Sequence, residues 1–334
     1  MAARTDFARR TVCSKLFVSL FAVIALTLAA VPPLQADDWP QRPIRIINPY
    51  AAGGNSDVVA RLTAQRLSEA LGQQFVVENR VGGNGAIAAE AVAHAAPDGY
   101  TLLWGVQPAV VITPAMTKVP FDPIKDFAPV SVTGTNPFIL VVNKDVPAKT
   151  VKEFIAWVKS QPAKLNYAEG STGSVTHLAM ALFLKRAGIE MTHVSYRGNN
   201  PALTDVIAGH IPTMFSNASD AFPQIKSGSI RALAVSSTER LPQLPDTPAV
   251  AELFPGYAAV TWNGLLAPAG TPKPIIAKMA EVIQKACKDP KFVERLASIG
   301  VDPLGNTPEQ FAVLIEKDLK TWAEAVEIAG VKIQ

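Results

Sequence analysis

The 334-residue chain has 31 basic and 28 acidic side chains and a mean hydropathy of +0.19. Residues 1–36 contain four of the basic residues and one of the acidic ones, which leaves 27 of each sign in the rest of the chain. This balance argues against a nucleic-acid-binding protein, which would need a basic stripe. The remaining length of about 298 residues suggests two domains or one large one.

Residues 1–36 have the pattern of a secretory signal. Basic residues within 4–15 precede an uncharged run at 16–31, and Ala36 supplies the small residue that a signal peptidase needs. The run is shorter than the roughly 20 residues that span a membrane. We therefore predict export to the periplasm and cleavage near Ala36–Asp37, rather than an uncleaved anchor. Cys287 then remains alone, so no internal disulfide can form.

Short apolar runs alternate with helical patterns along the first third of the exported chain. A 3.6-residue spacing of apolar side chains predicts helices, and short apolar runs bounded by Gly, Pro or Asn predict strands. The predicted strands cover 44–47, 75–77 and 100–104, and the predicted helices begin near 56 and cover 86–95.

The same alternation continues to the C-terminus, apart from a proline-rich and irregular stretch at 241–255. Strands are predicted at 138–142, 165–168, 193–196, 230–235 and 261–267, and helices at 151–160, 175–187, from 200, 273–288, 290–299 and 307–328. Strands that alternate with helices form parallel sheets, so we predict an α/β fold with mostly parallel sheets.

The pattern changes near residues 133–137 and 256–262, which we interpret as domain boundaries. The chain then starts in one lobe, enters a second and returns. The prediction is a signal peptide at 1–36, a discontinuous first lobe of 37–135 and 262–334, and a second lobe of 136–261. Two lobes joined by two crossing strands can hinge around a ligand.

Two Gly-rich loops each connect a strand to a helix N-terminus. Ligands of open α/β sheets bind at such strand ends, and helix N-termini attract anions through free N–H groups. The alternative interpretation is that both loops are ordinary turns and caps. The candidate ligand-binding residues of these loops are Tyr50, Ala51, Gly53, Gly54, Ser56, Ser171, Thr172, Gly173 and Ser174.

Further polar residues follow other predicted strands. Arg197 and the adjacent Gly198 precede a helix, and Arg197 could clamp a carboxylate or form a surface salt bridge. Ser216 and Asn217 form a fourth polar strand end, and Gln107 is also a candidate ligand contact.

Two ionisable candidates have alternative roles. The negative charge of Asp57 would repel an anionic ligand. Asp57 is therefore expected to stabilise its own helix start, or alternatively to contact a ligand amine. His177 lies just inside a helix beside Ser174, where capping or packing is expected rather than catalysis.

Other chemistries lack a supporting motif. Residues 83–88 match G-x-G-x-x-A, but five residues separate them from the preceding strand, too many for a dinucleotide-binding turn. The four histidines show no metal-ligand spacing, so no metal site is predicted. No base–nucleophile pair stands out, so we predict neither an enzyme nor a cofactor.

Several ordered motifs resemble one family. Residues 49–61 read PYAAGGNSDVVAR and resemble the P-x-x-x-G-G-x-x-D-x-x-A-R opening of tripartite tricarboxylate transporter substrate-binding proteins, also called Bug receptors. Further resemblance lies at 78–80, 97–103, 171–178, 201–205 and 264–272.

The resemblance implies a two-lobed periplasmic binding fold of the type II, Venus flytrap kind. It implies a monomer that closes on a small organic carboxylate, gripping one end with Tyr50–Asp57 and the other with Ser171–Ser174. The partner would be a membrane permease or a sensor protein. A secreted α/β enzyme remains the rival interpretation.

The chain departs from the family pattern at three places. Ser216 stands where the family usually has Asp, Arg197 stands where Lys is common, and residues 83–88 are an altered glycine-rich loop. The loss of an acid at Ser216 leaves the ligand's identity, and any contact with a ligand amine, open.

Overall fold

A computed structural model describes residues 39–331 of the chain. The fold described below is that of the unit that begins at Pro40. The predicted signal and its cleavage site lie outside the described residues. Among those described, no helix combines the length and the apolar character that a membrane crossing requires.

One group of strands is built around parallel β1, whose neighbours are β2 and β3. Strand β9 continues this group antiparallel to β3, and the short β10 pairs with β4. The bounds are β1 (Ile44–Asn48), β2 (Phe75–Asn79), β3 (Thr101–Val106), β9 (Val260–Pro268) and β10 (Asp302–Pro303).

A second group contains parallel β6, β5 and β7, followed by antiparallel pairs of β4 with β7 and β8. The bounds are β5 (Asn166–Glu169), β6 (Thr192–Ser195), β7 (Thr213–Asn217) and β8 (Ile230–Val235).

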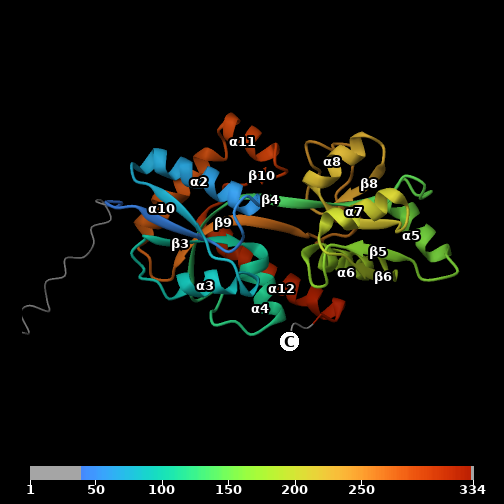
Figure 1. Ribbon diagram of the computed structural model, residues 1–334, viewed down its shortest axis with the longest axis horizontal. Coiled ribbons are helices and arrows are strands. Elements are labelled where there is room, and N and C mark those ends of the chain that lie inside the picture. The colour runs from blue at the N-terminus through green and yellow to red at the C-terminus, as the bar shows by residue number, and fades with distance from the viewer. Residues whose placement is uncertain (1–38, 332–334) are drawn as a thin grey trace, which may run out of the picture. The chain divides into compact units, whose positions relative to one another are not determined.

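The long strand β4 (Phe127–Asn143) joins the two groups, as the green arrow in Figure 1 shows. Its first part, up to Pro137, pairs with β9, and its second part, from Phe138, pairs with β7 and β8. The strand order is β2-β1-β3-β9-β4-β7-β5-β6. Both groups are therefore mixed, and the prediction of mostly parallel sheets is wrong, because β4 and β9 pair antiparallel with each of their neighbours among the described strands.

Helices cover these sheets and begin, in most cases, directly after a strand or a short loop. Their bounds are α2 (Asn55–Leu71), η2 (Gly83–Gly85), α3 (Ala86–Ala93), η3 (Pro108–Ile112), α4 (Thr113–Met116), α5 (Val151–Ser160), α6 (Val175–Ala187), α7 (Asn199–Ala208), α8 (Ala218–Lys226), α9 (Val250–Leu253), α10 (Lys273–Ala286), α11 (Pro290–Ala297) and α12 (Pro308–Ala329).

The predicted α/β fold and the predicted helices and strands are confirmed, with end shifts of a few residues. The first part of β4 was missed because Pro129, Gly134 and Pro137 read as loop residues. The strand accommodates them with two register shifts against β9, between Pro129 and Ser131 and between Val132 and Gly134. The π-helical turn η3 and helix α8 carried no clear sequence signal, and α8 even contains Pro223.

Helix α12 packs against elements of both strand groups. It contacts β4 and η3, and it also contacts α6, which follows β5. Phe311 meets the ring of Trp262 edge-on at 4.9 Å between centroids, and Glu324 lies 3.7 Å from Arg186 on α6. Helix α12 therefore adds a packing contact between the two strand groups, in addition to the crossing strands β4 and β9. The predicted lobe boundaries stay a prediction.

Candidate functional site

The first Gly-rich loop is held by a buried carboxylate. Asp57, in the first turn of α2, is only 3% exposed. Its oxygens accept hydrogen bonds from Gly53 N at 3.0 Å, from Asn79 Nδ2 at 2.8 Å and from two Arg61 nitrogens at 2.9 and 3.0 Å. Burial raises the pKa of Asp57, but bonds from Arg61, Gly53 and Asn79 outweigh it and bring the pKa to about 2.

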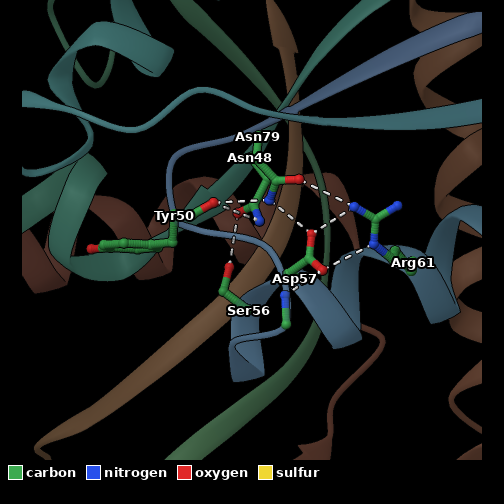
Figure 2. A network of polar contacts seen from close by, with 7 residues as sticks. Asn48, Tyr50, Ser56, Asp57, Arg61 and Asn79 are labelled. Atoms are coloured by element: carbon green, nitrogen blue, oxygen red, sulfur yellow. Dashed lines mark hydrogen bonds and ion pairs between the residues drawn. The ribbon is translucent and has the colours of Figure 1, made fainter.

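Asparagines at the ends of β1 and β2 fix the rest of this loop, as Figure 2 shows. Asn79 and Asn48 donate to the Tyr50 carbonyl at 2.9 and 3.4 Å, and the Ser56 hydroxyl donates to Asn48 Oδ1 at 3.0 Å. The ring of Tyr50 points away from this network. Asp57 therefore joins the loop to β2 and to its own helix, and its alternative role as a contact for a ligand amine stays a prediction.

Two neighbouring cavities meet at Tyr50 and Pro108. The first, called the Ser174 cavity, has a volume of about 270 Å³ and is lined by Tyr50, Asn84, Pro108, Ile112, Thr113, Met116, Ser171, Thr172, Gly173, Ser174 and Val175. The second, called the Asn217 cavity, has about 230 Å³ and is lined by Tyr50, Asn55, Ser56, Val106, Pro108, Asn136, Pro137, Asn217, Ala218, Ser219, Thr261, Asn263 and Gly300.

Helix N-termini, not charged side chains, supply positive potential to both cavities. The Ser174 cavity receives the start of α6, and the Asn217 cavity receives the starts of α2 and α8. Neither lining, as far as the chain is described, contains a charged side chain. Each helix start carries free N–H groups and about half a positive charge, which favours anions.

The Ser174 hydroxyl is also a helix cap. It accepts a hydrogen bond from His177 N at 3.3 Å and lies 3.1 Å from the Thr176 hydroxyl. Capping and ligand binding therefore both remain open roles for Ser174, because the residue caps α6 and also lines the Ser174 cavity.

Part of the predicted candidate set gathers around the two cavities. The candidates that line them are Tyr50, Ser56, Ser171, Thr172, Gly173, Ser174 and Asn217. Ala51, Gly53 and Gly54 are exposed in the first loop and line neither cavity. Their role in the geometry is to bring the chain from β1 to α2.

Four other candidates stand apart from the cavities. Gln107 is completely buried, close to Asp318, and Ser216 is also buried, accepting from Asn199 at 3.3 Å. Gly198 donates its N–H to the Gly170 carbonyl at 2.7 Å. This bond joins the loop after β6 to the loop after β5. Arg197 is exposed and makes no hydrogen bond or ion pair with any described residue, so of its two alternatives the surface salt bridge does not form and the carboxylate clamp stays a prediction.

Sequence reasoning missed the lining residues that come from η3, α4 and the crossing strands. Pro108, Thr113 and Met116 belong to the helical turns after β3, and Asn136 and Asn263 face each other across β4 and β9, joined at 2.6 Å. No local motif marks these positions. Asn84 could have been noticed from the sequence, because it lies in the altered glycine-rich loop. In the structure it adopts a positive φ of 50°.

His177 belongs to a cluster that its sequence spacing did not indicate. Its side chain is buried and lies beside Glu169 and His193, and one donor atom from each of the three falls within 4.8 Å of the others. These donors come from α6, β5 and β6. The expectation of no metal site rested on spacing along the chain, which does not detect residues brought together by a parallel sheet.

The fold and these cavities define the class of protein. Two strand groups joined by crossing strands, with helix N-termini turned to shared polar cavities, form a binding protein of the periplasmic type. Residues 59–331 match the model of the tripartite tricarboxylate transporter family receptor, and the chain belongs to this family. The family is one of solute-binding receptors.

Solved structures of relatives support this assignment. The periplasmic binding protein BugD is 33% identical, with 89% of this chain and all of that chain covered and a TM-score of 0.67. A protein of R. palustris solved with adipate is 34% identical over 88% of this chain and 99% of that one, with a TM-score of 0.71. MatC of Rhodopseudomonas palustris, solved with malate, is 33% identical over 86% of this chain and all of that one, with a TM-score of 0.67.

Proposed function

We propose that this receptor captures a small organic carboxylate in the Ser174 and Asn217 cavities and delivers it to the membrane permease of a tripartite transporter. The observation that carries the proposal is the pair of uncharged polar cavities on either side of Tyr50 and Pro108, each next to a helix N-terminus. Free N–H groups and hydroxyls at such positions bind carboxylates without a basic side chain.

A ligand with two carboxylates fits this arrangement best. One group would meet the start of α6 in the Ser174 cavity, and the other would meet the starts of α2 and α8 in the Asn217 cavity. Adipate and malate, held by two of the similar proteins, are both dicarboxylates. A thermal-shift screen of mono-, di- and tricarboxylates, with the matching diamides as controls, tests this preference.

We also propose that the lobes move about the crossing strands, with lobes bounded as predicted. The crossing residues are paired with each other, Asn136 with Thr261 and Pro137 with Val260, directly before β4 changes partners. A hinge there would open and close the Asn217 cavity, because Asn136, Pro137 and Thr261 line it.

Ser174→Ala is expected to weaken carboxylate binding about ten- to a hundredfold. A hydrogen bond to a charged group contributes roughly 1.5–3 kcal/mol, and that range corresponds to this change in Kd. Loss of the cap on His177 N should also lower stability by about 1 kcal/mol. Calorimetric titration with the best ligand of the screen, at a temperature where both proteins are folded, measures the affinity.

The control for this substitution is Ser160→Ala, since the Ser160 hydroxyl is on α5 and donates to its own helix at Trp157. It should leave Kd unchanged. A Ser174→Ala protein with unaltered Kd and a lowered Tm would make the residue a cap alone, and would remove it from the proposed ligand contacts.

We further propose that residues 1–36 are removed on export. The basic segment, the apolar run and Ala36 are the features of a cleaved signal. Intact-mass measurement of protein recovered from the periplasm should give a chain that begins at Asp37. Recovery of the full 334-residue chain would refute cleavage without affecting the binding proposal.

A further inference from the structure

Three side chains that the proposed function does not use meet behind the Ser174 cavity. Glu169 ends β5, His193 lies on β6, and His177 lies in the first turn of α6. Glu169 Oε2 is 3.0 Å from His177 Nδ1, and Oε1 is 3.3 Å from His193 Nδ1. The two imidazole rings stack with centroids 4.9 Å apart.

The sheet explains why these residues converge. Strands β5 and β6 are parallel, with Tyr167 opposite His193 and Glu169 opposite Ser195. Because side chains alternate between faces with a period of two, Glu169 and His193 lie on the same face of the sheet. The short loop after Glu169 then leads into α6 and places His177 over that face.

One oxygen of Glu169 lacks a conventional partner. The side chain is completely buried, and Oε2 accepts no hydrogen bond from any described residue. His177 Nδ1 already accepts a hydrogen bond from Gly173 N at 3.1 Å, so the neutral ring carries its hydrogen on Nε2. Oε2 and Nδ1 then face each other, each with a lone pair and neither with a hydrogen. This contact requires a proton or a metal ion between them.

We propose that Glu169, His177 and His193 bind one divalent transition-metal ion of the Zn²⁺ type. Two imidazoles and one carboxylate, with an open fourth position, form a donor set that suits zinc and not calcium or magnesium. Bond lengths of about 2.1 Å in a tetrahedral site separate neighbouring donors by about 3.4 Å. One donor atom from each of the three side chains lies within 4.8 Å of the others, so small side-chain rotations bring the three to that separation.

The surroundings of the cluster are compatible with a metal ion. The His193 side chain is 48% exposed, which gives an entry path and a place for a water ligand. The Thr172 hydroxyl donates to Glu169 Oε1 at 3.1 Å and holds the carboxylate in position. Gly173 N donates to His177 Nδ1 and would lose this acceptor when His177 binds the metal.

Titration of the untagged protein, first stripped with EDTA, tests the proposal with Zn²⁺ alone. Calorimetry should show one equivalent bound per chain, and Co²⁺ should give the visible absorption of a tetrahedral site. His193→Ala and Glu169→Gln should each weaken Zn²⁺ binding about a hundredfold. His210→Ala is the control, because His210 is exposed and faces Asp205, and it should bind Zn²⁺ like the unmodified protein.

His193→Ala decides the outcome if Glu169→Gln fails to fold, since His193 is half exposed. Circular dichroism of each variant establishes folding before titration. Absence of saturable Zn²⁺ binding would show that a proton joins Glu169 to His177, and would overturn the proposal. Equal Zn²⁺ affinity in His193→Ala and in the unmodified protein would overturn it as well. Neither result bears on carboxylate binding.

Discussion

Gly85→Ala is expected to lower the free energy of unfolding by about 2–5 kcal/mol. Gly85 has a φ of 92°, where a non-glycine residue costs roughly 1–2 kcal/mol. An added Cβ would also lie 2.4 Å from the Cβ of Ala109 and 3.1 Å from that of Pro49. Such overpacking typically costs a further 1–3 kcal/mol. Denaturant unfolding followed by circular dichroism measures the change.

Gly72→Ala is the matched control for the clash at Gly85. Gly72 also has a positive φ, 72°, but an added Cβ there would meet nothing within 4 Å. Its substitution should therefore show the backbone cost alone. Equal destabilisation of the two variants would mean that η3, which carries Ala109, shifts freely away from Gly85. A displacement of η3 should also weaken ligand binding through Pro108, which lies in η3 and lines both cavities.

Asp57→Asn is expected to lower the free energy of unfolding by about 2.5 kcal/mol at pH 7. The pKa of Asp57 falls from its ordinary 3.8 to about 2 in the folded protein, and a difference of this size corresponds to that energy. An asparagine would retain one acceptor but would place its amide hydrogens against Arg61, Asn79 or Gly53, which are themselves donors.

The pH dependence of this effect has a definite sign. Because the folded pKa is lowered, the carboxylate stabilises the protein fully above the unfolded value of 3.8 and loses that contribution as pH falls towards 2. The difference between the unmodified protein and Asp57→Asn should therefore shrink between pH 6 and pH 3. Urea unfolding at both pH values measures it.

Glu190→Gln is the control for Asp57→Asn, because the pair of Glu190 with Lys164 is exposed and should leave Tm unchanged. A Tm for Asp57→Asn equal to that of the control would show that the loop does not depend on this carboxylate. Ligand titration of Asp57→Asn adds a functional readout, since the bonds of Asp57 and Asn79 position the Tyr50 carbonyl.

Signals confined to a few neighbouring residues determined most of the fold from the sequence. Apolar periodicity placed α6 and α12 to within a residue, and the capping residue Ser174 was recognisable because a cap and its N–H partner are three residues apart. The order of motifs likewise identified the family, which the match over residues 59–331 confirms. The two Gly-rich loops were visible because a strand, loop and helix start follow one another in the chain.

Only the tertiary structure decided how these local elements combine. Asp57 joins its helix to the next strand because Asn79, on that strand, and Arg61 reach its carboxylate. Residues distant in sequence, such as Asn136 and Asn263, line one cavity because β4 and β9 pair there.

The same limit explains the cluster of Glu169, His177 and His193, which no spacing rule in the sequence could detect. Strand register and helix packing are set by buried contacts between residues far apart in the chain, so local patterns do not specify them.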